Sequence, residues 1–402
     1  MSTTSSGTSS GVDAPVRDFN HHSDPAVRVD PFTAFDRFRD ERVFWTEELD
    51  GFWVLTRHAD IRAVLRDTDA FSSRHTSIPP AGWPRPLMPV ELDPPDHNRY
   101  RALLARCLNG AAGSTITRAL ETASARLVER LAPAGECDLV LDFARPLQNA
   151  LFAALFDVPE EETQACSRWA DDLLQDVDPG RRARATTEFM AYVGRAIGEY
   201  ETGVRGGDGT GLLDVLASAE VDGEPLSREQ ALDLAFLMGM ASLDTLTNSV
   251  SFTFRYLAAH PEHQHRLAAE PGIAASAAEE LLRLHSVVSI ARTATRDTEV
   301  AGVRLRAGDR VLLNLSLAGR DPHHYPDPAS ADFDRANSAS HVAFGFGAHR
   351  CLGARIATQG LAAALRDWHT SIVDYSVGPG AELAMDGGAV CSLENLPLVW
   401  RS

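Results

Sequence analysis

The chain has 402 residues, 44% of them hydrophobic and 23% charged, which is enough apolar material for one large core or two ordinary ones. A formal net charge of −18 argues against nucleic-acid binding, which needs a basic patch, and against docking on an anionic membrane. No window holds the run of about 18 or more apolar residues that a membrane-spanning helix needs.

Residues 1–23 are polar and of low complexity, which predicts a flexible tail followed by a single domain over 24–402. The start, MSTTSSGTSSG, has neither the basic residues nor the apolar stretch of a signal peptide, so we expect a cytoplasmic protein. The five cysteines are odd in number and widely scattered, which argues against a disulfide framework and structural zinc.

The first half of the chain predicts a strand at 51–56, a helix at 58–67 and mostly helical structure from 96 to about 201. Residues 203–211 are typical of a surface linker. Between these segments, residues 72–95 form a proline-rich loop that also carries apolar side chains. Loops of that length are usually functional.

A capping-box pattern at Ser227 and Gln230 predicts the start of a long helix that continues to His260-Pro261. About 32 residues at 1.5 Å each would make one rod of roughly 48 Å, which we expect to cross the interior. A second helix ends at 279–285, paired strands alternate over 298–316, and a strand closes the chain at 396–400. The expected fold class is therefore mainly α with a small β portion, without a linker that divides it.

The segment 341–365 predicts a tight glycine turn, a cysteine and then a helix. Gly345 and Gly347 permit a bulged turn close to a bound group. The helix N-terminus behind Cys351 offers unpaired N–H groups and a positive dipole end, which favour a thiolate that can ligate iron. The alternative is a structural cysteine buried near a helix start.

The string FGFGAHRCLG (344–353) resembles, at every defining position, the haem-binding signature FxxGxxxCxG of the cytochrome P450 family. The resemblance implies the cytochrome P450 fold, with the long central helix crossing the haem. It also implies haem b with Cys351 as the axial metal ligand, and Phe344 and Gly345 beside the cofactor.

Glu280 and Arg283 form an ExxR pattern, whose i,i+3 spacing places both side chains on one helical face. Alone, this pattern describes an ordinary surface ion pair. The resemblance implies a buried structural pair behind the haem, joined by Arg335 from the sequence ADFDRA.

His97 and Arg101 are four residues apart, so they share a helical face and can both reach one carboxylate. By resemblance this is the haem-propionate helix, and Arg292 and His349 are two further propionate partners. Without the cofactor they would be solvated helix charges.

Asp244, Thr245 and Asn248 lie in an apolar stretch of the long helix, where carboxylates are costly and usually paired or functional. The resemblance makes Asp244 and Thr245 the catalytic acid–alcohol pair that delivers protons to dioxygen. Ser242 stands where the family commonly has glycine, so it must open the helix by back-bonding, and Leu246 replaces a frequent second threonine. This helix and the chain's last strand are most similar to the camphor-hydroxylating bacterial subgroup.

The resemblance also places a set of apolar side chains on the distal side, which suggests a small hydrophobic substrate. Each of them could equally be plain core. The set is Ile78, Trp83, Leu87, Met88, Ala241, Val287, Val288, Ile290 and Val390.

The resemblance implies a monooxygenase that inserts one atom of O2 into a C–H or C=C bond, with electrons from a separate ferredoxin and a ferredoxin reductase that uses NAD(P)H. Radical coupling or peroxide-driven oxidation on the same scaffold is an alternative, and a haem-based sensor or carrier is another. We expect a monomer, whose acidic ferredoxin would dock on a proximal arginine patch formed by Arg101, Arg106, Arg350 and Arg355.

Overall fold

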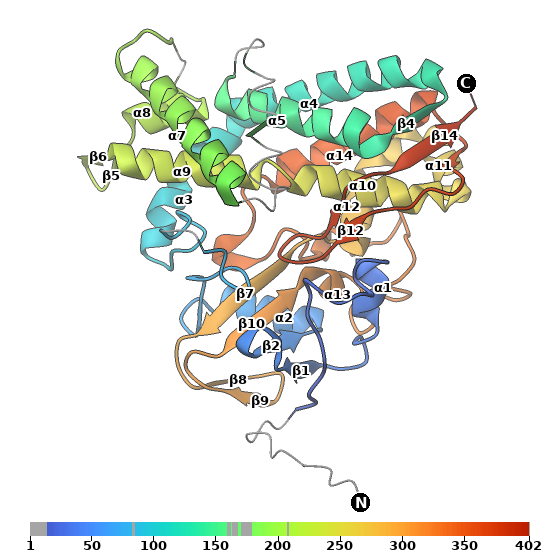
Figure 1. Ribbon diagram of the computed structural model, residues 1–402, viewed down its shortest axis with the longest axis horizontal. Helices are drawn as coiled ribbons and strands as arrows, with labels where there is room; N and C mark the ends of the chain where they lie inside the picture. The colour runs from blue at the N-terminus through green and yellow to red at the C-terminus, as the bar shows by residue number, and fades with distance from the viewer. Residues whose placement is uncertain are drawn as a thin grey trace, which may run out of the picture.

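The computed structural model describes residues 14–82, 85–158, 162, 168–169, 179–206 and 209–401. Most of these residues are helical, and most of the helices lie together in the upper part of the view, while α1, α2 and α13 lie beside the larger sheet (Figure 1). The helices are α1 Pro31–Asp36, α2 His58–Arg66, α3 Asp96–Leu108, α4 Gly110–Leu131, α5 Arg145–Phe156, α7 Pro179–Glu201, α8 Leu212–Ser218, α9 Arg228–Ala241, α10 Thr245–Ala258, α11 Pro261–Ala269, α12 Ala274–Leu284, α13 Leu315–Gly319 and α14 Ala354–Ser371.

The largest sheet has five strands in the order β1-β2-β10-β7-β3, and only the β10–β2 pair is parallel. A second sheet joins the chain's last strand to two distant segments, in the order β11-β14-β4. The strands are β1 Val43–Thr46, β2 Phe52–Leu55, β3 Phe71–Ser72, β4 Glu136–Asp138, β5 Glu220–Val221, β6 Glu224–Pro225, β7 Ser289–Ala294, β8 Thr298–Val300, β9 Val303–Leu305, β10 Arg310–Asn314, β11 Tyr375–Val377, β12 Met385–Asp386, β13 Ser392–Leu393 and β14 Pro397–Trp400. The mainly α fold with a small β portion is confirmed.

The prediction of a flexible tail over residues 1–23 is wrong for residues 14–23, while residues 1–13 lie outside the described part. Val16 forms a parallel bridge with Trp45, and the Arg17 N–H donates to the Trp45 carbonyl at 2.8 Å. Phe19 is 1% exposed and makes edge contacts with Phe38 and Phe44. One buried aromatic ring outweighs the polar composition around it, because burying its apolar area stabilises the segment.

The single long helix expected from Ser227 onward is also corrected, because it is two helices, α9 and α10, that lie end to end across the molecule (Figure 1). The predicted capping box at Ser227 and Gln230 is present. The helix stops at Ser242, whose hydroxyl donates to the Gly239 carbonyl at 2.9 Å, as expected for a serine that back-bonds. Asp244 then adopts φ −140° and precedes the first turn of α10.

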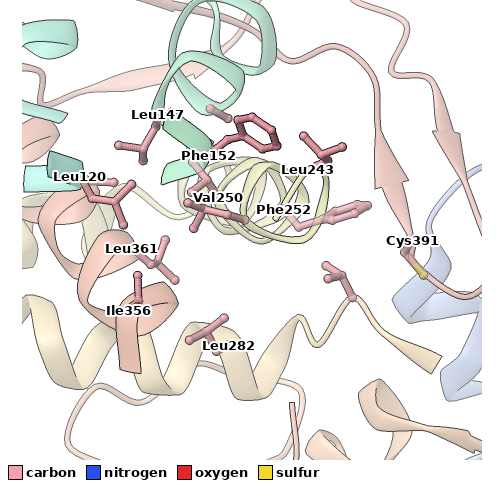
Figure 2. Packing of buried hydrophobic residues seen from close by; sticks show 14 of the residues in the cluster. Leu120, Leu147, Phe152, Leu243, Val250, Phe252, Leu282, Ile356, Leu361 and Cys391 are labelled. Atoms are coloured by element: carbon pink, nitrogen blue, oxygen red, sulfur yellow. The ribbon is translucent and has the colours of Figure 1, made fainter. Parts of the chain in front are cut away.

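The broken helix is the centre of the main hydrophobic core. Figure 2 views this helix end-on, with Leu147 and Phe152 of α5 on one side and Ile356 and Leu361 of α14 on another. The apolar side chains that keep helical spacing along α10 therefore find partners on every side, which explains why this element is interior. Among the described residues, no helix combines the length and apolar character needed to cross a bilayer.

Candidate active site

The cysteine loop folds back on itself before α14. Gly345 and Gly347 have φ of +68° and +73°, a left-handed conformation that L side chains rarely adopt. A Cβ on Gly347 would lie 2.6 Å from the Leu65 carbonyl oxygen, so glycine is also required for space. The turn lets the Cys351 N–H donate to the Phe344 carbonyl at 2.8 Å. The sequence therefore sets Cys351 at the end of a closed loop.

Cys351 lies directly before the N-terminus of α14. The N–H groups of Gly353 and Ala354 point at its sulfur, as the sequence predicts. Cys351 is exposed as a residue, but protein surrounds its sulfur, and this burial raises the pKa of the thiol. The two N–H groups and the charges of Arg101 and Arg350 lower that pKa. The loop thus gathers the positive groups that a thiolate needs.

The four predicted propionate partners converge, although they come from α3, β7 and the cysteine loop. The rings of His97 and His349 lie 3.9 Å apart, and Arg101 donates to the Arg350 carbonyl. Arg292 is 3% exposed, and burial lowers its pKa to about 10. Burial, followed by the charges of His97, Arg292 and Arg101, lowers the pKa of His349 to about 3. These groups repel one another, so the cluster favours an anion.

This cluster fits the cofactor that the resemblance implies. Both ring nitrogens of His349 are buried and lack a hydrogen-bond partner among the described residues. A buried polar atom of that kind is costly unless a ligand satisfies it. A dianionic group next to a thiolate matches haem, whose two propionates would take hydrogen bonds from the cluster while Cys351 holds the iron.

The acid–alcohol pair lies at the break between α9 and α10. Asp244 accepts a hydrogen bond from the Asn248 amide at 2.6 Å, and the Thr245 hydroxyl donates to the Ala241 carbonyl at 3.3 Å. Burial raises the pKa of Asp244 to about 6, although the Asn248 amide and the Arg145 charge lower it. The Thr245 hydroxyl thus bonds to the Ala241 carbonyl, which in a continuous helix would accept the backbone N–H of Thr245.

Sequence reasoning missed Gln148, which holds this break from α5. Its amide nitrogen donates to the Leu243 carbonyl, and its amide oxygen accepts from the Thr247 N–H at 3.1 Å and the Thr247 hydroxyl at 2.9 Å. Gln148 is 3% exposed. Its position in the apolar sequence RPLQNALF was the available signal, since a buried amide needs partners.

Glu280 and Arg283 form a fully buried pair. Arg283 donates to both carboxylate oxygens of Glu280 at 2.8 Å, and both side chains are 0% exposed. Arg335 adds a third bond at 2.8 Å, and the Asp332 N–H a fourth at 2.9 Å. Burial tends to raise the pKa of Glu280, but the two arginines outweigh it and the pKa lies below its usual value. This geometry matches the arrangement that the resemblance implies.

Three of the segments that carry expected substrate contacts meet along β7. The Ala291 N–H donates to Thr76 of the proline-rich loop at 2.8 Å, and the Ser289 N–H donates to Ala389 of the C-terminal loop at 2.9 Å. Val288 bridges Val390 directly. Within this set, Ile78 and Val287 are buried, Ala241 is exposed at the end of α9, and Trp83 lies outside the described residues; Leu87, Met88, Val288, Ile290 and Val390 are half-buried.

Comparisons with known proteins agree with the resemblance to the cytochrome P450 family. A sequence model described as "Cytochrome P450" matches residues 273–367. The chain is 33% identical over 357 residues to "Probable cytochrome P450 127A1" of Sinorhizobium fredii, which covers 88% of this chain and 85% of that protein. It is 30% identical to "Cytochrome P450 monooxygenase PikC" of Streptomyces venezuelae, over 93% of this chain and 92% of that protein.

Solved structures show the same fold. The crystal structure of CYP101J2 matches with a TM-score of 0.87 at 28% identity, over 98% of this chain and 100% of that chain. This fold, with a cysteine loop before α14 and a buried basic cluster, defines an oxidoreductase of the haem-thiolate class. The chain belongs to the cytochrome P450 family.

Proposed function

We propose that this chain is a haem-thiolate monooxygenase that inserts one atom of O2 into a small hydrophobic molecule, of the terpenoid or other secondary-metabolite kind. The observation that carries the proposal is the Asp244–Thr245 pair at the helix break. Relatives named "Pentalenic acid synthase" and "20-oxo-5-O-mycaminosyltylactone 23-monooxygenase" support the substrate class.

When bound, haem b supplies the iron at which oxygen chemistry takes place. The residues of the chain would divide the remaining work. Cys351 would hold the iron, and His97, Arg101, Arg292 and His349 would bind the propionates. With a pKa of about 6, the Asp244 carboxyl can take up and release protons near neutral pH, and the Thr245 hydroxyl would position them.

The apolar side chains beside β7 support a hydrophobic substrate. Val288, Ile290 and Val390 are half-buried, and they lie on segments that hydrogen bonds tie to one strand. An apolar ligand placed against them would gain free energy by leaving water. Ile78 and Val287 would support this wall from the core.

Electrons would come from a separate ferredoxin, reduced by a reductase that uses NAD(P)H. Arg106, Arg350 and Arg355 are exposed, and Arg101 is half-buried and donates to the Arg350 carbonyl. Such a cluster on a chain of net charge −18 would steer an acidic protein toward the side of the cysteine loop. The association should therefore weaken as salt concentration rises.

The test is the coupling of reducing equivalents to product. Thr245→Ala should leave substrate binding and electron uptake nearly unchanged, while NAD(P)H consumption yields hydrogen peroxide in place of oxidised product. Thr253→Ala, the same change deeper in α10, is the matched control and should keep the parent's coupling. Full coupling in Thr245→Ala would contradict the role of this alcohol. Peroxide-driven turnover without a reductase would favour peroxide-driven oxidation on the same scaffold.

A further inference from the structure

A buried histidine joins α12 to the cysteine loop. The side chain of His341 is 3% exposed, and its Nε2 lies 2.9 Å from a carboxylate oxygen of Glu279. The Ala343 N–H donates to His341 Nδ1 at 3.1 Å. Because Nδ1 accepts, Nε2 must carry the proton and donate it to Glu279. Both nitrogens of the ring therefore have assigned partners.

Glu279 lies close to both ends of the loop that presents the cysteine. His341 precedes Phe344, whose carbonyl accepts the Cys351 N–H and whose ring centroid is 5.8 Å from that of His341. At the other end, the charge of Arg350 acts on the same carboxylate. The hydrogen bond from His341 lowers the pKa of Glu279 most strongly. Burial opposes this effect as the second-largest cause, and the Arg350 charge lowers the pKa further by a smaller amount.

The other side of this contact is rigid. Glu279 is followed in α12 by Glu280, which Arg283 and Arg335 hold through three hydrogen bonds of 2.8 Å. A carboxylate on such a helix can therefore act as a fixed anchor for the loop. A bond between two mobile surface groups could not do this, since it would follow their motion.

We propose that Glu279 and His341 form a strut that positions the Cys351 loop and thereby sets how firmly the thiolate is held and how strongly it donates to iron. The inference rests on the proposed haem-thiolate function. Both are positioning residues, because they act through the loop backbone. Groups beyond the direct ligands commonly orient a ligand and tune a metal centre in this way.

The strut can be tested with two variants and a control. His341→Phe keeps a ring but removes both hydrogen bonds, and Glu279→Gln keeps an acceptor but removes the charge. The control is His265→Phe, which removes a histidine bonded to Asp374 where both side chains are more than half exposed. In each holoprotein we would measure three quantities: the haem midpoint potential, the rate at which the reduced carbon monoxide complex loses its red-shifted thiolate Soret band, and amide exchange over 342–351.

In His341→Phe we expect both the loss of the thiolate band and amide exchange over 342–351 to be at least about ten-fold faster than in the parent, because a charge-assisted hydrogen bond is lost. Glu279→Gln should raise the midpoint potential, because it removes a negative charge near the ligand loop. His265→Phe should match the parent in all three measurements. If His341→Phe does not accumulate as holoprotein, His341→Gln takes its place.

Parent-like values in both variants would overturn the proposal. So would band loss that follows the global free energy of unfolding in urea without faster exchange in the loop, since the pair would then only stabilise the fold. If the parent itself lacks the thiolate band, the proposed function fails. Amide exchange would still show whether the strut holds the loop.

Discussion

Replacing Glu280 with alanine should cost a large part of the protein's stability. The substitution removes the acceptor of two bonds from Arg283, one from Arg335 and one from the Asp332 N–H. Arg283 is 0% exposed, so its charge cannot turn to water. It keeps the carbonyls of Gly319, Pro328 and Ser330, but these lack a compensating charge.

Breaking a buried ion pair from one side typically costs about 3–5 kcal/mol. A domain's whole stability is about 5–15 kcal/mol, so Glu280→Ala should give little holoprotein and a much lower urea midpoint. Glu280→Gln keeps the shape and one acceptor oxygen, and it provides a measurable free energy if the alanine variant does not accumulate. It should fall between the parent and alanine.

The matched control is Asp334→Ala. Asp334 also accepts two hydrogen bonds from an arginine, Arg266, at 2.8 and 2.9 Å, but its side chain is 71% exposed. Water replaces the lost partner there, so the cost should stay below about 1 kcal/mol. Urea unfolding followed by circular dichroism gives both values. Similar losses for Glu280→Ala and Asp334→Ala would refute the argument from burial.

Three further predictions concern the cofactor, the loop and acid stability. The double variant Arg101→Ala, Arg292→Ala should lose haem faster on dilution, since each arginine would contribute about 1.5–3 kcal/mol to haem binding. The control is Arg99→Ala, because Arg99 is exposed on α3, the helix of Arg101. Equal haem retention in the double variant and the parent would contradict the cluster's role. Gly347→Ala should destabilise far more than Gly380→Ala, because both have φ +73° but only the first Cβ meets a backbone oxygen, and equal urea midpoints would refute this. Burial lowers the pKa of His21 from its usual value near 6.5 to about 3, so the contribution of the neutral ring to the free energy of unfolding is complete above pH 6.5. At pH 5 this contribution is smaller by about 2 kcal/mol. His21→Phe should remove that part of the acid loss in urea titrations at pH 7.5 and 5, and parallel pH dependence would contradict it.

The sequence by itself determined the features that depend on a few neighbouring residues. The capping box at Ser227, the glycine turn before Cys351 and the ExxR spacing of Glu280 and Arg283 are local patterns, and each is present in the structure as predicted. Backbone sterics and helical periodicity act over one or two turns, so these patterns carry their own geometry.

Only the tertiary structure decided how distant segments meet. At the helix break after Ser242, Gln148 of α5 bonds to Leu243 and Thr247, which are 95 and 99 residues away in the chain. Composition predicted a free tail where packing buries Phe19. The contact of His341 with Glu279 spans 62 residues and left no periodic signal. Such pairs depend on which surfaces the folded core brings together, and neither propensity nor spacing encodes that choice.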